Sequence, residues 1–225
     1  MTVNICLDGP SGAGKSTVAK AVAKKLGILY LDTGATFRAL AVKAMRENLD
    51  MTNDEELTSF LNNTSVSLKF DNEKKNMTVL LDNEDVTGLI RENGVSLVAS
   101  AISAYPKTRE KLMKDWRAIA KNNDVIMDGR DIGTVVLPTA KYKFYLTADS
   151  RERARRRFEE LKAKGEIVDI DVLQKQIEER DYNDSTRKTA PLKKADDAVL
   201  IDSTNISAEE VADIIIRAVE KGGER

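Results

Sequence analysis

Apolar residues along this chain fall into two patterns, short continuous runs and stripes at helical spacing. The continuous runs have the length of buried strands, and segments with apolar residues every three or four positions lie between them. Strands that alternate with helices pair in parallel through right-handed crossovers. The pattern predicts an α/β fold, with a five-stranded parallel sheet and helices on both faces. The predicted strands are residues 3–7, 28–31, 124–128, 141–146 and 198–202.

A different period interrupts this pattern between about residues 63 and 88. Apolar and polar residues alternate along 66–70 and again along 77–81, and the stretch between them, 71–76, is entirely polar. Alternation with a period of two is typical of half-buried strands joined in a hairpin. We therefore expect a small antiparallel β insertion.

Capping residues set the expected limits of several helices. Thr52 followed by Glu55 fits a capping box at the start of a helix over 52–61. A helix is also predicted over 89–104. A proline is favoured in the first turn of a helix, so a third one begins at Pro106 and runs to about residue 121. The last helix runs from about 207, where Ser207 is the expected N-cap, to 221.

The strongest motif follows the first predicted strand. The segment 9–17 fits G-x-x-x-x-G-K-[ST], and a helix from about Lys15 to Gly27 comes after it. Glycines let consecutive backbone N–H groups turn toward a phosphate, and the positive end of the helix points at the same anion. This predicts a P-loop NTPase-type fold that binds a nucleoside triphosphate. The expected binding residues are Gly9, Pro10, Ser11, Gly12, Ala13, Gly14, Lys15, Ser16 and Thr17.

A magnesium ion is expected beside this loop. The Ser16 hydroxyl can hold Mg²⁺, and Asp128 at the end of the third predicted strand is the expected carboxylate partner. Asp32 follows the second predicted strand, so the sequence leaves open which carboxylate lies nearer to the ion.

Composition narrows the classes of protein. With 36 Lys and Arg against 37 Asp and Glu, the net charge is −1, which argues against a general nucleic-acid binder. The sequence has no histidine, which excludes His-based catalysis and His ligation of metals. A single cysteine, Cys6, fits a reducing compartment and a buried apolar role. The absence of a signal-peptide pattern and of a membrane-length apolar stretch predicts a cytoplasmic protein without membrane contact.

Two charged segments predict a mobile cover for the triphosphate site. Five arginines fall within 151–157, directly after the fourth strand, and the helix that carries them breaks at 162–165. A second helix, 171–187, carries one stripe that begins apolar and becomes charged. Arginines on a closing flap neutralise a transferred phosphoryl group and exclude water. The stripe consists of Leu173, Ile177, Arg180, Asp184 and Arg187.

A phosphate monoester is the acceptor that would suit this chain, whereas an alcohol acceptor would call for a carboxylate base close to the loop. The second pKa of the monoester is about 6, so it is ionised at neutral pH and needs no protein base, which suits a chain without histidine. Arg38, in the first turns of the helix after the second strand, can reach over the strand ends where ligands bind in open α/β sheets.

Several segments together resemble the bacterial cytidylate kinases, a family of nucleoside monophosphate kinases, over essentially the whole chain. The matching segments are 8–17, 32–34 with Arg38, 128–134, 179–181 and 190–192. The inserted hairpin is characteristic of the bacterial enzymes. The resemblance implies transfer of a phosphoryl group from ATP to CMP or dCMP with Mg²⁺, by a monomer, in pyrimidine metabolism.

The resemblance also implies roles for single residues. Thr33 would line the monophosphate site, while Arg38, Arg130 and Arg187 would hold the phosphate or sugar of CMP. Ser100, Arg109 and Asp131 would read the cytosine edge, and Asp184 the ribose. The lid residues Arg153, Arg157 and Arg180 would close on the transferred group, beside Lys15 and Arg130.

The implied organisation is a single P-loop kinase domain over 1–225. Its core comprises 1–32, 106–149 and 188–225, its monophosphate-binding region 33–105 includes the insertion at about 63–88, and its lid covers about 150–187.

Three other functions stay open on the sequence alone. Another P-loop small-molecule kinase, acting on UMP or on an alcohol such as shikimate, shares the loop; an alcohol acceptor would require a carboxylate base. A guanine-nucleotide switch usually carries Asn-Lys-x-Asp, whereas Asn205 is followed by isoleucine. A P-loop motor or nucleic-acid ATPase would be longer and more basic.

Overall fold

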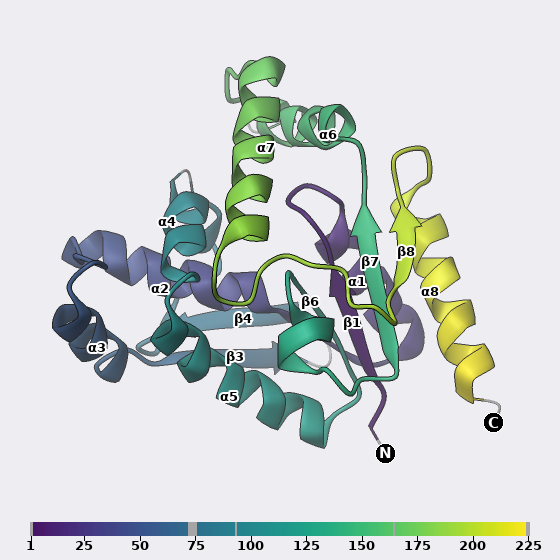
Figure 1. The fold of residues 1–225 in the computed structure, drawn as a ribbon, viewed down its shortest axis with the longest axis horizontal. Coiled ribbons are helices and arrows are strands. Elements are labelled where there is room, and N and C mark those ends of the chain that lie inside the picture. Colours follow the sequence, from purple (N-terminus) through teal and green to yellow (C-terminus); the bar gives the residue numbers. More distant parts are fainter. Residues whose placement is uncertain (1, 72–75, 93, 164, 224–225) are drawn as a thin grey trace. The chain divides into compact units, whose positions relative to one another are not determined.

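The computed structural model describes residues 2–71, 76–92, 94–163 and 165–223. The chain divides into two compact units. The strand unit comprises Met1–Tyr30 and Asp124–Arg225, and the hairpin unit comprises Leu31–Asn123. Figure 1 labels most of the helices and strands of both units.

A five-stranded sheet organises the strand unit, in the order β2-β6-β1-β7-β8. Its strands are β1 (Asn4–Asp8), β2 (Leu29–Asp32), β6 (Val125–Gly129), β7 (Tyr142–Thr147) and β8 (Val199–Asp202), with β2 ending in the hairpin unit. The pairings β1–β6, β1–β7 and β7–β8 are parallel. All five predicted strands are confirmed, to within a residue or two at each end.

Helices α1 (Lys15–Leu26) and α8 (Ala208–Gly223) pack together against this sheet. Their apolar stripes share one core cluster with the strands, in which Val18, Leu146 and Ile215 are almost fully buried. Cys6 is also fully buried in β1, and burial raises the pKa of its thiol far above the ordinary value. The predicted helix ends are confirmed at Gly27, the C-cap of α1, and at Ser207, whose hydroxyl accepts the Glu210 N–H at 3.2 Å.

Two further helices of the strand unit lie side by side beyond the end of β7 (Figure 1). They are α6 (Ser150–Ala163) and α7 (Ile170–Thr186). Leu173 and Ile177 of α7 pack with Ala154 and Leu161 of α6 in a small core of their own. The predicted apolar start of the α7 stripe is therefore confirmed. We call this helix pair the lid.

The hairpin unit contains the predicted β insertion. Strands β3 (Val66–Asp71) and β4 (Asn76–Leu81) pair antiparallel, and a short third strand, β5 (Glu84–Asp85), adds to β4. Most of the predicted polar turn, 72–75, lies outside the described residues. The unit also contains α2 (Thr33–Glu47), α3 (Asp54–Asn62), the 3₁₀ turn Leu89–Arg91, α4 (Val95–Ile102) and α5 (Pro106–Asn122).

Two predicted helix limits in this unit are wrong. The N-cap of α3 is Asn53, whose side chain accepts the N–H groups of Glu55 and Glu56, whereas the Thr52 hydroxyl bonds to Asp50 at 2.6 Å. The single helix predicted over 89–104 is two elements, because Glu92 is extended and Gly94 has a φ of 83°.

Candidate functional site

The loop between β1 and α1 has the backbone that a phosphate nest requires. Gly9, Gly12 and Gly14 have φ angles of 150°, 75° and 91°, a region that favours glycine. A Cβ on Gly9 would lie 2.0 Å from the carbonyl oxygen of Leu146, so no other residue fits there without a shift of β7. Gly14 has no side chain to cap α1, so the first N–H groups of this helix remain available to an anion.

Lys15 folds back onto this loop. Its Nζ donates to the carbonyl of Pro10 at 2.6 Å, and the residue is only 6% exposed. Burial and the nearby Arg130 lower the pKa of Lys15 well below its ordinary value. Because an anion next to the amine would favour its charged form, phosphate binding is expected to raise this pKa again.

The predicted metal pair is brought together. The Ser16 hydroxyl donates to Asp128 Oδ2 at 2.9 Å, and the Tyr30 hydroxyl reaches Asp128 Oδ1 at 3.2 Å. Asp128 is the penultimate residue of β6 and is 4% exposed. No cluster of three or more His, Cys, Asp or Glu side chains suited to a metal occurs in the described part of the chain. One hydroxyl and one carboxylate would fit Mg²⁺ if phosphate oxygens and water supplied its other ligands.

A second cluster joins the segment after β6 to the end of α7. Arg130 Nε donates to Asp184 Oδ2 at 2.8 Å, and Arg187 lies 3.8 Å from both Asp131 and Asp184. Burial opposes the charge of Asp184, but the neighbouring arginines outweigh it and lower the pKa of this carboxylate. Four of the predicted acceptor-binding residues thus share one cluster, in which Asp131 and Asp184 are buried and the two arginines are partly exposed. Two arginines and two aspartates balance in charge there, and a buried carboxylate such as Asp184 is costly unless it is paired.

The lid arginines differ in what they contact. Arg153 donates to the carbonyls of Ala148 and Ser11, both at 2.9 Å, and Arg180 Nη1 lies 3.3 Å from the Ser11 hydroxyl. Arg157 instead pairs with Glu160 at 3.0 Å on an exposed part of α6, so the structure does not bring it to the phosphate loop.

Three groups at this site are missing from the sequence-based set. Asp8 accepts the N–H groups of Ile132 and Gly133, each at 2.8 Å, and burial raises its pKa from 3.8 to about 6. Asp181 contacts Ser11 and Arg153.

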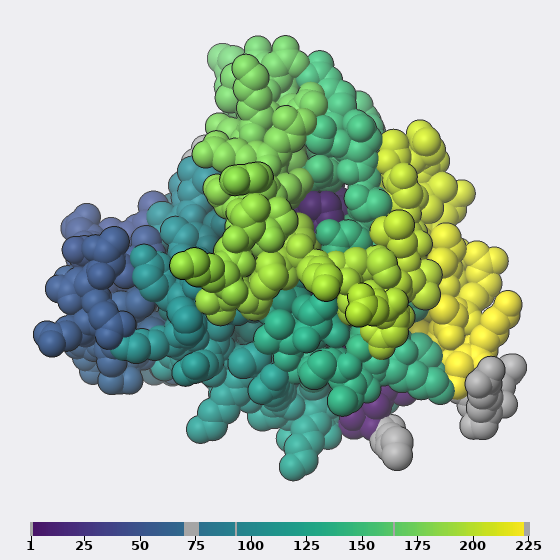
Figure 2. Space-filling model, in the orientation of Figure 1, coloured from purple at the N-terminus to yellow at the C-terminus, as the bar shows by residue number. Residues whose placement is uncertain are grey.

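The third is Arg156, which donates to the Ser203 carbonyl at 2.5 Å, while the Ser203 hydroxyl donates to the carbonyl of Ala13 at 3.2 Å. Positions next to known motifs hinted at Asp8 and Asp181, but no pattern pointed to Ser203. The atoms around these groups belong to the strand unit. Figure 2 shows purple atoms of the N-terminal segment within a hollow that green atoms of the lid border.

The hairpin unit carries the other predicted acceptor residues in two groups. Asp32 is the N-cap of α2, accepting the Ala35 N–H at 2.9 Å, and it also pairs with Arg38 at 2.7 Å. Thr33 follows it and is buried. Asp32 is therefore committed to its own helix, while Asp128 is the carboxylate that contacts Ser16.

The second group contains Ser100 and Arg109. Arg109 is 3% exposed, lies 5.5 Å from the centre of the Phe37 ring, and contacts the Ser103 carbonyl at 3.4 Å. The Ser103 hydroxyl in turn donates to the carbonyl of Ser100 at 2.8 Å. The structure thus links these two predicted residues through Ser103.

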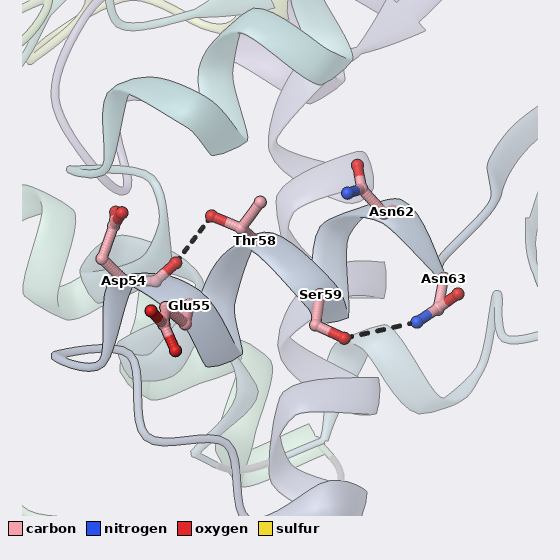
Figure 3. Close-up of a pocket in the computed structure, with 6 residues that line it drawn as sticks. All are labelled: Asp54, Glu55, Thr58, Ser59, Asn62 and Asn63. Atoms are coloured by element: carbon pink, nitrogen blue, oxygen red, sulfur yellow. Dashed lines mark hydrogen bonds between the residues drawn. The ribbon is translucent and has the colours of Figure 1, made fainter.

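An open pocket on α3 has a different character (Figure 3). All of its lining residues come from this one helix and its end, and they are Asp54, Glu55, Thr58, Ser59, Asn62 and Asn63. Its lining includes no glycine and no arginine, and two of the side chains are carboxylates, so it lacks the features of the phosphate loop.

A phosphate loop contacted by arginines from a helical pair defines the class as a P-loop phosphotransferase. Comparison with known proteins gives the family. The family model described as cytidylate kinase matches residues 5–221. The cytidylate kinase of Caldicellulosiruptor saccharolyticus is 48% identical over 219 residues, which cover 97% of this chain and 96% of that protein. That of Pelotomaculum thermopropionicum is 49% identical, with the same coverage of both chains. The chain belongs to the cytidylate kinase family.

One further expectation concerns membranes. Among the helices that the structure describes, none has the length and apolar character to cross a bilayer.

Proposed function

We propose that this chain transfers the γ-phosphoryl group of ATP to CMP or dCMP, giving ADP and CDP or dCDP. The bond between the γ-phosphorus and the bridging oxygen of ATP breaks, and a phosphate oxygen of the acceptor forms the new bond. The observation that carries the proposal is the phosphate loop with the Ser16–Asp128 pair, beside a cluster of Arg130, Asp184 and Arg187. Membership of the cytidylate kinase family supports the same reaction.

The donor would bind at the loop. Its backbone N–H groups and the positive end of α1 suit the phosphates. The pKa of Lys15 is lowered in the empty site, and the bound triphosphate would favour the charged form of its amine. Ser16 and Asp128 would hold Mg²⁺, directly or through water. The ion would neutralise charge on the phosphate oxygens and fix their position. The residues proposed for ATP are Gly9, Pro10, Ser11, Gly12, Ala13, Gly14, Lys15, Ser16 and Thr17.

The acceptor would bind by its charge and its base. Arg130 and Arg187 suit a phosphate monoester because guanidinium groups bind such oxygens in pairs. Asp184 pairs with both arginines. Once the phosphate of the nucleotide replaces this carboxylate beside the arginines, Asp184 would accept a hydrogen bond from a sugar hydroxyl. From the hairpin unit, Thr33 and Arg38 are proposed for the phosphate.

Cytosine presents an amine donor beside acceptor atoms. A carboxylate, a guanidinium and a hydroxyl together match that edge, and Asp131, Arg109 and Ser100 provide these groups. We propose these three residues as the readers of the base.

Transfer itself needs charge neutralisation more than proton transfer. Lys15, Arg130, Arg153 and Arg180 are the groups proposed for this step. The acceptor phosphate is its own nucleophile, so the lack of histidine is no obstacle. Arg157 stays a prediction from the family resemblance, since its pairing with Glu160 would have to break first.

An acceptor panel tests the proposal. Purified protein with ATP and Mg²⁺ is offered CMP, dCMP, UMP, shikimate and water alone, and ADP formation is followed by a coupled assay. We expect CMP and dCMP to give rates far above the water background. ADP formed with shikimate or UMP but not with CMP or dCMP would refute it. Gel filtration would test the expected monomer, and a cytoplasmic location stays a prediction.

A further inference from the structure

Three side chains of the lid meet at a single residue of the phosphate loop. Arg153 comes from α6, and Arg180 and Asp181 come from α7. Arg153 donates to the Ser11 carbonyl at 2.9 Å, and Asp181 Oδ1 accepts the Ser11 N–H at 3.2 Å. Arg180 approaches the Ser11 hydroxyl at 3.3 Å. Both backbone groups of Ser11 and its side chain are therefore held by the lid.

Asp181 is the member that links the other groups to one another. While Oδ1 binds the loop, Oδ2 accepts a hydrogen bond from the Arg153 guanidinium. This pair is largely buried, with side chains 8% exposed for Arg153 and 20% for Asp181. One carboxylate thus joins α6, α7 and the loop.

A second pair of the same residue types connects the two lid helices elsewhere. Arg151 of α6 pairs with Asp171 of α7, but these side chains are 51% and 71% exposed. None of the contacts that the structure describes for Asp171 reaches the phosphate loop. A surface pair of this kind contributes little, because water and salt screen it. The chain therefore provides its own control for the Asp181–Arg153 pair.

We propose that Asp181 is a positioning residue, which holds Arg153 against the phosphate loop at Ser11. This inference rests on the proposed function, in which Arg153 neutralises the transferred phosphoryl group. A guanidinium with four rotatable side-chain bonds is pre-organised only when its partners fix it. Ala148 and Ser11 offer neutral carbonyls, whereas Asp181 offers a charge-assisted bond, which is about twice as strong. Without Asp181, the guanidinium would lose the ionic partner that the described part of the lid gives it.

Hydrogen exchange of the nucleotide-free protein tests the contact itself. Exchange of the Ser11 amide is measured by NMR in the wild type, in Asp181→Ala and in Asp171→Ala. We expect about tenfold faster exchange in Asp181→Ala, which corresponds to the loss of one hydrogen bond to a charged group. Asp171→Ala should leave this amide unchanged. Equal Ser11 exchange in all three proteins would overturn the inference.

A double-mutant cycle tests the positioning role. Asp181→Ala is expected to lower kcat by about tenfold, with little change in KM for ATP or CMP, because the misplaced group acts in the transition state. In an Arg153→Ala background, the same change should have an effect of less than about twofold, because nothing is left to position. Additive losses, or a rise in KM at constant kcat, would overturn the role.

The two proposals fail in different ways. A wild-type protein that converts no CMP or dCMP would contradict the proposed function, and the Ser11 exchange measurement would then still decide whether Asp181 holds the loop. An active wild type with an unaltered Asp181→Ala variant would contradict the positioning role alone.

Discussion

A buried carboxylate at the end of β1 makes stability depend on pH in an unusual direction. Asp8 is 4% exposed, and burial raises its pKa from 3.8 to about 6, although two backbone N–H groups partly offset this. In the folded protein, the Asp8 carboxyl therefore keeps its proton in a pH range where the same group of the unfolded chain has already released it. The contribution of Asp8 to stability is complete below pH 3.8 and is lost as the pH rises through about 6.

The size of the effect follows from the pKa difference. About two pKa units correspond to about 3 kcal/mol over the whole titration. Within the range that most proteins tolerate, from about pH 4.5 to about pH 7.5, about 2 kcal/mol of this should be visible. Asp8→Asn removes the titration and leaves the other groups in place. The free energy of unfolding of the wild type, minus that of Asp8→Asn, should fall by about this amount across the range.

Urea unfolding of both proteins at several pH values measures this difference by linear extrapolation. Subtracting the variant cancels the titration of distant groups, whose effects add independently. A difference that stays constant, or that grows as the pH rises, would refute the assignment of a raised pKa to Asp8. Unequal m-values would show that the substitution altered the unfolding transition itself.

Three other predictions follow from single contacts. Gly9→Ala should abolish tight ATP binding, measured by titration calorimetry, because its Cβ would lie 2.0 Å from the Leu146 carbonyl oxygen. Gly27→Ala is the control: open space surrounds this Cβ, so the substitution should only lower the free energy of unfolding, by about 1 kcal/mol. Asp128→Asn should raise the Mg²⁺ concentration for half-maximal activity by about tenfold, with exposed Asp196→Asn as the unchanged control. Arg153→Ala should lower kcat by about 100-fold. Arg157→Ala breaks only the exposed pair with Glu160, so its kcat should fall far less. A similar fall of kcat in both variants would show that the lid rearranges during turnover.

Much of the strand unit could be predicted because its signals are local. The glycine spacing of the loop fixed the position of Lys15 and Ser16, and the apolar runs gave the strands that carry Asp8 and Asp128. Since parallel strands end at one edge of a sheet, Asp128 was expected near Ser16, and the two are 2.9 Å apart. The signal for the β3–β4 hairpin was also local. An alternation with a period of two places one face of each strand toward the core, so it is typical of a strand and not of a helix.

The errors arose where polar groups had a choice of partners. Thr52 was a reasonable N-cap, but Asp50 accepts its hydroxyl and Asn53 caps α3 instead. The break before α4 depends on the positive φ of Gly94, which a helical apolar pattern does not reveal.

The same limit applies to the roles of charged residues. Arg153 and Arg157 stand one helical turn apart, and spacing alone does not say that the first reaches Ser11 while the second pairs with Glu160. The contacts of Asp181 join segments about 170 residues apart, so only the folded chain brings them into view.

Phosphoryl transfer between two nucleotides is the central claim, and ³¹P NMR of one mixture tests it most directly. Purified protein is incubated with ATP, Mg²⁺ and CMP, and the phosphorus signals are followed with time. The account predicts that the CMP signal declines as the two signals of CDP and those of ADP grow, with little inorganic phosphate. Growth of ADP and inorganic phosphate beside an unchanged CMP signal would contradict it.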